Sequence, residues 1–196
     1  LQTGGARRLA TALTDATISV AVDAWLTDAT TAESTYGHIS TWDTSQVTDM
    51  ADLFCTSGSY GGCSHPHTNA YLFNEDISGW DVSQVTSMAY MFVGAMAFNQ
   101  PLDGWDVSRV TSMNSMFLGA TIFNQPLGSW DVSRVEDTHN MFSVAEAFDQ
   151  DLSSWRLCSV TTIMHMFRFA YAFDQDLSTW CFENNVMGHS GTFTGT

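Results

Sequence analysis

The stretch FNQPLDGWDVSRVTSMNSMFLGATI, residues 98–122, is followed at once by FNQPLGSWDVSRVEDTHNMFSVAEA, residues 123–147. The two stretches match in phase, and the same phase continues on both sides of them. Tryptophans recur every 25 residues, at Trp80, Trp105, Trp130, Trp155 and Trp180. Self-similarity at such a period predicts a stack of repeats, because one unit cannot bury its own Trp, Met and Phe side chains and depends on its neighbours.

Two apolar patterns follow each other within a repeat. The first is Leu-x-x-Trp-x-Val-x-x-Val over residues 102–110, whose central Trp-x-Val alternates as a strand with one buried face does. This is also the spacing of a leucine-rich repeat, with Trp in place of the second Leu. The second pattern steps by three and four residues, as a short helix does, through Met113, Met116, Phe117 and Ala120. The predicted fold is an α/β repeat solenoid, a leucine-rich-repeat-like right-handed coil with one short parallel strand and one short helix per repeat.

The two ends and one insert interrupt the period. Residues 1–38 are expected to form an N-terminal segment with a capping helix whose N-terminus is capped by Asp15, and residues 39–193 a solenoid of about six repeats. Residues 194–196 are expected to form a C-terminal tail. The first repeat carries 13 additional residues between positions 54 and 73, because Trp42 lies 38 residues before Trp80.

The chain is strongly acidic. The 196 residues carry a formal net charge of −15, from 21 acidic residues and six basic ones, all of which are Arg. Nucleic acid and anionic lipid headgroups are therefore excluded as partners, since too few cationic groups exist to neutralise phosphates. No apolar run reaches the roughly 20 residues that a transmembrane helix needs. Cations, basic proteins and neutral glycans remain as candidate partners.

The cysteines form two well-separated pairs, Cys55 with Cys63 and Cys158 with Cys181. This arrangement favours two disulfides and an oxidising compartment over a metal site, although four buried thiols would give the same sequence. We expect a secreted or cell-surface protein, with an oxidising organelle lumen, as part of a complex, as the alternative. The second pair lies on adjacent coils as diagonal neighbours, near the limit of disulfide reach.

The repeat string FNQPLxxWDVSxVTSMxxMFxGA resembles the BspA-like surface-protein repeat, a leucine-rich-repeat relative found in bacterial surface proteins, mycoplasma lipoproteins and some microalgae. The resemblance covers residues 39–193. It implies a secreted or surface-attached solenoid with an adhesion or interaction role, and it supplies no catalytic residues. Repeat scaffolds take their partners from exposed positions that vary freely, so the resemblance does not identify a partner.

One acidic row is a candidate binding face. Its members follow the tryptophans at Asp43, Asp81, Asp106 and Asp131, with Arg156 at the next equivalent position. The favoured interpretation is an Asx-type turn, because each Asp is followed two residues later by Ser. The alternative is a calcium site formed by Asp81, Asp106 and Asp131, although a flat row supplies poorly the six or more oxygens that calcium needs.

The insert is the other candidate site, since it is the longest departure from the repeat. A Cys55–Cys63 disulfide is expected to close it, and its predicted contact residues are Tyr60, His65, His67 and Tyr71. The Cys-x-His-x-His pattern matches no closed zinc spacing, so no metal site is predicted.

These features predict a non-catalytic protein-interaction or structural module, either an adhesin-like surface domain or a peripheral subunit of a larger assembly. Other proteins are the expected partners, through the insert or an end coil, and glycans are a further possibility. The alternative is a calcium-dependent lattice that binds carbohydrate or another surface. No enzyme is predicted, because the carboxylates form an even row and the histidines do not cluster with an acid and a nucleophile. No cofactor is expected apart from possible calcium.

Overall fold

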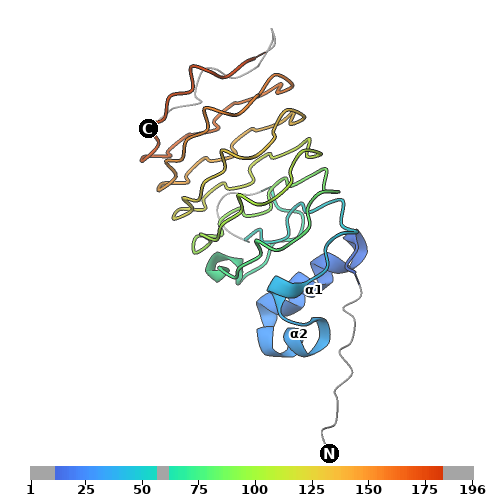
Figure 1. The fold of residues 1–196 in the computed structure, drawn as a ribbon. Coiled ribbons are helices and arrows are strands. Elements are labelled where there is room, and N and C mark those ends of the chain that lie inside the picture. The colour runs from blue at the N-terminus through green and yellow to red at the C-terminus, as the bar shows by residue number, and fades with distance from the viewer. Residues whose placement is uncertain (1–11, 57–61, 183–196) are drawn as a thin grey trace, which may run out of the picture.

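The computed structural model describes residues 12–56 and 62–182. Two helices, α1 (Asp15–Thr27) and α2 (Ala29–Tyr36), lie at one end of a stack of coils (Figure 1). Two single-turn 3₁₀ helices follow, η1 (Ile39–Thr41) in the first coil and η2 (Ala70–Leu72) at the end of the insert. The coils are layered one above another along the stack, so residues 25 apart lie beside each other.

Helix α1 forms where the sequence predicts a helix, but its N-cap residue is Thr14 and not the predicted Asp15. The side chains of Thr14 and Thr17 make a capping box at its start, which satisfies backbone N–H groups that have no partner within the helix. Its buried residues recur at helical spacing, at Ile18, Ala21, Val22 and Trp25. Because this face is continuous with the core of the coils, α1 covers the first coil and shields it from water.

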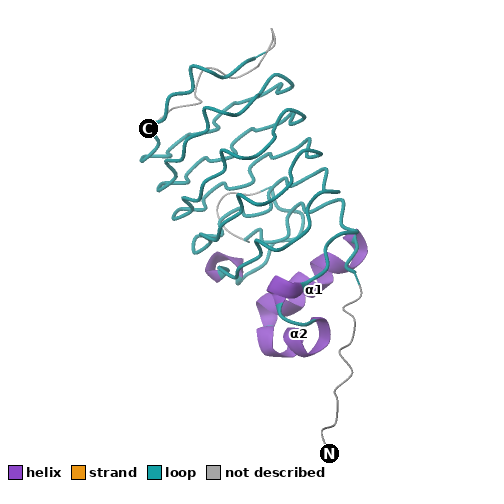
Figure 2. Ribbon diagram, viewed as in Figure 1, coloured by secondary structure: helices purple, strands orange, loops and turns teal. Residues whose placement is uncertain are grey.

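The predicted parallel strands are wrong. Within residues 12–56 and 62–182 no strand or sheet is present, and the coils appear as loops and turns in Figure 2. The Trp-x-Val segment stays short because the chain turns on both sides of it. The Trp105 N–H donates to the Leu102 carbonyl at 3.1 Å, and the Val110 N–H donates to the Val107 carbonyl at 2.9 Å. Within the described residues, the β-bridges between successive coils from the first to the last are isolated parallel bridges of one residue each, at Asp49, Ser87, Ser112, Asp137 and Thr162.

The predicted helix in each repeat is also wrong, so the α/β solenoid class does not describe this chain. Ser115 has a φ of 54°, in the left-handed region that interrupts an α-helix, and Tyr90, Asn140 and His165 repeat this conformation. The backbone N–H groups alternate between two kinds of acceptor. The Phe117 N–H donates to Met141 of the next coil at 2.9 Å, whereas the Leu118 N–H donates back to Ser115 at 3.1 Å. These alternating turns return apolar side chains to the core every three or four residues, which imitates a helical pattern.

Phenylalanines fill the core as two parallel columns. In the first column, from Phe54 to Phe167, ring centroids of successive coils are 5.5–5.6 Å apart. In the second, from Phe73 to Phe173, they are 5.8–6.1 Å apart. Rings of the two columns meet within each coil at 4.0–4.2 Å. The offset between columns lets each ring contact neighbours in its own coil and in the next, so burial is shared along the stack.

The tryptophans that recur every 25 residues, from Trp80 to Trp180, each bond the coil before them. The Trp130 Nε1–H donates to the Leu102 carbonyl at 2.9 Å, and the Trp155 Nε1–H donates to Leu127 at 2.9 Å. Trp80, Trp105 and Trp180 make the equivalent bond. A buried indole N–H without an acceptor would cost free energy, so these bonds fix the register of each coil on its predecessor.

A second polar ladder lies at the corner after the phenylalanines. The Asn124 Oδ1 accepts hydrogen bonds from the Asp149 N–H at 3.0 Å and from the Gln150 Nε2 at 2.8 Å. Asn99 and Asp149 accept in the same way from the coils that follow them. The position requires an oxygen acceptor and accommodates either an amide or a carboxylate.

At the far end of the stack the predicted Cys158–Cys181 disulfide is present. Its Cα atoms are 5.2 Å apart, within the usual range for a disulfide. It joins the last two described coils.

We predict that Asn124→Ala lowers the free energy of unfolding by about 1–3 kcal/mol, because two half-buried donors lose their acceptor. Asn124→Asp is the matched control and should cost less than about 1 kcal/mol, since Asp149 performs the same role one coil later. Urea unfolding followed by circular dichroism measures both. Equal losses in the two variants would show that the side-chain oxygen does not carry the ladder.

Gly94 provides a second test, because its φ is 66° and an added Cβ would collide with the side chain of Thr56. Gly94→Ala should destabilise the protein by about 2 kcal/mol through backbone strain and this contact. Gly104→Ala is the matched control, since a Cβ there meets nothing within 4 Å. Its melting temperature should stay within a few degrees of the parent's, and a similar loss in both variants would contradict the argument.

Candidate functional site

The insert folds back on the first coil. Cys55 and Cys63 form the predicted disulfide, with Cα atoms 6.1 Å apart. The His67 N–H donates to the Cys55 carbonyl at 2.7 Å, and Thr56 and His67 form an isolated parallel bridge. The two sides of the insert are therefore held together both by a covalent bond and by backbone hydrogen bonding.

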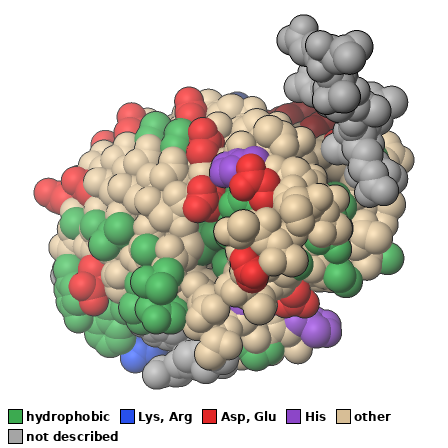
Figure 3. Space-filling view, turned by 90° about the horizontal axis from the view of Figure 1, so that it is seen from below, with side chains coloured by type: hydrophobic (Ala, Val, Ile, Leu, Met, Phe, Trp, Pro, Cys, Tyr) green, Lys and Arg blue, Asp and Glu red, His purple; other side chains and the backbone are tan. Residues whose placement is uncertain are grey.

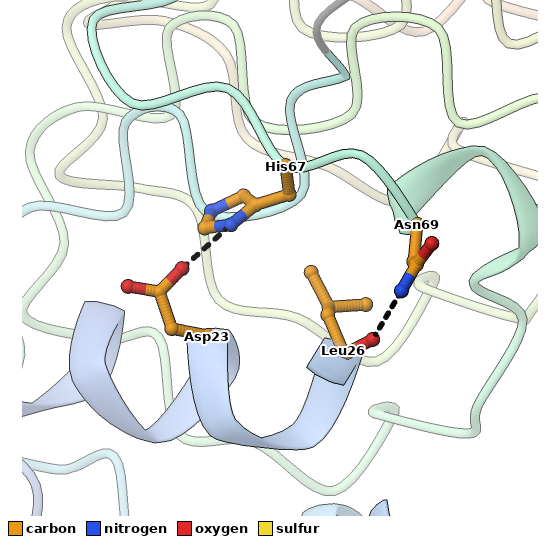
Figure 4. A network of polar contacts seen from close by, with 4 residues as sticks. All are labelled: Asp23, Leu26, His67 and Asn69. Atoms are coloured by element: carbon orange, nitrogen blue, oxygen red, sulfur yellow. Dashed lines mark hydrogen bonds and ion pairs between the residues drawn. The ribbon is translucent and has the colours of Figure 1, made fainter. Parts of the chain in front are cut away.

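Two polar contacts join the insert to α1 (Figure 4). The His67 Nδ1 lies 2.7 Å from the Asp23 Oδ1, and the Asn69 Nδ2 donates to the Leu26 carbonyl at 2.9 Å. Leu26 lies in the last turn of α1, where the backbone carbonyls have no N–H donor within the helix. The Asn69 amide supplies a donor to one of them. The insert thus closes over the C-terminal end of α1 and lines a small, largely polar pocket there with Pro66 and Thr68.

His67 is mostly buried while its partner Asp23 is exposed. Burial lowers the pKa of His67, because the charged imidazolium loses hydration, and the nearby Asp23 carboxylate opposes that effect only in part. His65 lowers the pKa further through its charge, and Asp52 raises it. The neutral ring is therefore favoured near neutral pH, and its Nδ1–H donates to Asp23.

The acidic row makes turns, as the favoured interpretation predicted. The Oδ1 atom of each Asp accepts the backbone N–H of the Ser two residues later, at 3.0–3.1 Å; the residues are Asp43, Asp81, Asp106 and Asp131. Hydrogen bonds from these serines lower the pKa of Asp43, Asp106 and Asp131, because they stabilise the carboxylate. Arg156 is exposed at the next position of the row. Calcium binding by Asp81, Asp106 and Asp131 stays a prediction.

The other predicted contact residues of the insert differ in their positions and exposure. Tyr60 lies outside the described residues, whereas His65 is exposed on the insert. Tyr71 is 44% exposed and lies in η2, four residues after His67.

Tyr71 belongs to a set of apolar side chains that the sequence analysis did not recognise as one surface. Five large apolar side chains with exposures of 44–64% occupy two adjacent positions of the repeat: Tyr71, Leu72, Met96, Ile122 and Tyr171. We call these five residues the apolar edge. Backbone bonds between coils hold the positions together, since the Ala97 N–H donates to Tyr71 at 3.0 Å and the Ala172 N–H donates to Glu146 at 3.1 Å.

Sequence reasoning also missed three polar residues of the insert region. Asp23 and Asn69 form the contacts to α1, and Asp52 lies within 4.8 Å of both sulfur atoms of the Cys55–Cys63 pair. The repeat gives one indication of Asp52, since the equivalent residues in later coils are Tyr90, Ser115, Asn140 and His165 and none of these is acidic. Nothing in the periodicity indicates Asp23 or Asn69.

Comparison with known families identifies the chain. A family described as "Mycoplasma protein of unknown function, DUF285" matches residues 28–108 and again residues 100–196. The chain belongs to this family. The two overlapping matches agree with its repeated sequence, whereas the narrower BspA-like resemblance stays a prediction. No curated protein and no solved structure matches the chain.

Within residues 12–56 and 62–182, no helix is both long and apolar enough to cross a membrane. The same part of the chain contains two disulfides. The disulfides are compatible with an extracellular location.

We predict that stability falls as the pH is lowered from about 7.5 to about 5.5, because the pKa of His67 is lower in the folded protein than in the unfolded chain. The unfolded state then binds more protons, so the contribution of His67 is complete above its unfolded pKa and is lost as the pH falls toward the folded one. Melting temperatures across this range measure the effect.

His67→Gln should flatten this pH dependence, since Gln does not titrate. His65→Gln, at an exposed neighbouring histidine, is the control and should retain most of the slope. An unchanged slope in His67→Gln would assign the pH dependence to other groups.

Proposed function

We propose that this member of the DUF285 family is a non-catalytic protein-interaction module, secreted or displayed at a cell surface, that binds basic segments of partner proteins along its apolar edge. The single observation that carries the proposal is the alignment of exposed apolar side chains on one corner of successive coils. Whether the module acts as an adhesin-like domain or as a subunit of a larger assembly depends on the partner.

Exposure on the apolar edge is selective. The repeat buries most of its other large apolar side chains, with Phe98, Phe123 and Phe148 fully buried one or two residues after the edge positions, although Met164 is 36% exposed elsewhere in the repeat. An interior so well packed leaves no structural need for Ile122 at 48% or Tyr171 at 62% exposure. Exposed apolar side chains grouped in this way mark interaction sites in soluble proteins, because their exposure to water costs free energy that a partner removes.

Acidic side chains border this surface. Glu146 lies within the edge itself, between the positions of Ile122 and Tyr171 along the stack, and Asp76, Asp151 and Asp176 are exposed on the adjacent corner. Figure 3 views the molecule from the end that carries α1 and α2, and in this view acidic side chains are common and basic ones are few. A partner segment that combines apolar residues with Lys or Arg is therefore complementary, and the acidic border accelerates its association at low salt.

Disulfides support a secreted or cell-surface location, since such bonds persist mainly in oxidising compartments. They also suit a module that must keep its shape outside the cell. The alternative as a calcium-dependent lattice receives less support, because one oxygen of each Asp in the acidic row is already used by a turn.

The experiment uses two synthetic peptides with the same apolar residues, one flanked by Lys and Arg and the other by Glu. We predict that only the basic peptide binds, as measured by fluorescence anisotropy, and that Ile122→Ser and Tyr171→Ser each weaken it by about tenfold, the effect of losing one buried apolar contact. Val20→Ser is the matched control, because Val20 is 55% exposed but lies on α1, and it should leave binding unchanged.

Two outcomes contradict the proposal. Binding that weakens equally in Val20→Ser would reflect general attraction to an acidic protein, and no binding of the basic peptide would exclude this edge as its docking site.

A further inference from the structure

Asp52 has a buried carboxylate oxygen without a hydrogen-bond partner. It is 9% exposed, and its Oδ2 accepts the Ser64 N–H at 3.1 Å. Its Oδ1 is buried and has no hydrogen-bond partner, and within residues 12–56 and 62–182 it is the single buried side-chain oxygen or nitrogen atom in that condition. Buried carboxylate oxygens without partners are unfavourable, so this one calls for a ligand.

The backbone does not explain the choice of Asp. Asp52 has a φ of 65°, and in later coils the same left-handed position is occupied by Tyr90, Ser115, Asn140 and His165. Asn satisfies this conformation as well as Asp does, without a buried charge. The carboxylate occurs only in the coil that carries the insert and the Cys55–Cys63 pair.

The three side chains lie close enough to share one ion. A carboxylate oxygen of Asp52 and the sulfur atoms of Cys55 and Cys63 all lie within 4.8 Å of one another. In a tetrahedral zinc site with bonds of about 2.0–2.3 Å, ligand atoms are about 3.3–3.8 Å apart. In the oxidised protein the two sulfur atoms are bonded to each other, so reduction lets them move apart to this spacing beside the Asp52 carboxylate.

We propose that reduction of the Cys55–Cys63 disulfide turns this group into a zinc site, with two thiolates and the Asp52 carboxylate as ligands and the fourth position open to water. Thiolate sulfur and carboxylate oxygen are both normal zinc ligands, and three protein ligands with one open position are a known arrangement. The proposal goes beyond the interaction function and does not depend on it.

The insert is anchored so that reduction does not separate the ligands. The His67 N–H remains bonded to the Cys55 carbonyl, and His67 and Asn69 hold the other end of the insert on α1. Cys63 therefore stays tethered four residues from a fixed point. Preorganised ligands bind zinc more tightly than the same groups in a flexible chain.

The chemistry balances with a dithiol as the reductant. The dithiol gives two electrons and two protons to the Cys55–Cys63 bond and becomes a cyclic disulfide, while the protein gains two thiols. Zinc then displaces one proton from each thiol into solution, and the carboxylate binds without losing a proton. Oxidation reverses the sequence by removing the two thiolates, so the site exists only in the reduced form.

Cobalt(II) is the probe, because tetrahedral cobalt bound to thiolate gives an intense charge-transfer absorption that zinc then abolishes by displacement. The full chain is reduced with a dithiol, the dithiol is removed so that it cannot bind the metal, and cobalt is added under anaerobic conditions. We expect the reduced protein to bind one cobalt ion and the oxidised protein to bind none. Cys55→Ser/Cys63→Ser should abolish the absorption, whereas Cys158→Ser/Cys181→Ser, the matched pair at the far end of the stack, should retain it.

Asp52→Asn is the decisive variant, since Asn keeps the left-handed turn and an acceptor for the Ser64 N–H but lacks the carboxylate charge. We expect it to weaken cobalt binding at least about tenfold. Equal affinity in Asp52→Asn overturns the proposal, because it is what two cysteines in an unfolded chain would give. Binding by the oxidised protein, absence of the thiolate absorption after reduction, or its survival in Cys55→Ser/Cys63→Ser also overturns it.

Discussion

Each coil depends on the bond between a buried indole N–H and a backbone carbonyl of the coil before it. The Trp130 Nε1–H has its acceptor in Leu102, and the carbonyl is available only when the two coils are in register. The phenylalanine columns add most of the apolar burial, but stacked rings tolerate sliding, whereas an indole N–H in an apolar interior does not. Directional hydrogen bonds therefore set the register, and hydrophobic burial supplies most of the stabilisation.

This division of roles explains why the interior is uniform and the exterior is not. Core positions repeat almost without change, because a substitution in one coil disturbs the contacts of both neighbours. The side chains at outer positions such as Thr121 and Ile122 are not enclosed by the neighbouring coils, so these positions accept apolar and acidic residues alike. The apolar edge and the insert both use this freedom.

The insert region differs from the coils in how it is stabilised. Ladders between equivalent residues stop at its edges, and a disulfide, the His67–Asp23 contact and the Asn69 amide replace them. Its stability is therefore sensitive to pH and to reduction, whereas the ladders of the coils contain few groups that titrate near neutral pH. Any regulation of this chain is most readily built into the insert for that reason.

Sequence patterns predicted much of the local chemistry and misjudged the backbone. The Asp-x-Ser turns, the N-terminal capping helix and both disulfide pairs follow from residues that are neighbours in sequence or in the repeat. The strand and helix of each repeat did not form, because Met113, Met116 and Phe117 reach the core equally well from alternating turns whose N–H groups bond the next coil. Spacing of apolar residues reports which side chains are buried and does not report the acceptor of each N–H group.

The sequence by itself determined the period and the stacking of equivalent residues, because both are encoded by repetition, and the pairing of the cysteines, because the two pairs are well separated along the chain. Only the tertiary structure decided that Asp23, Asn69 and Asp52 gather around the insert and that five apolar side chains share one edge. The physical reason is that the insert has no equivalent in other coils. Its contacts join residues far apart in the chain through geometry that no periodic pattern records.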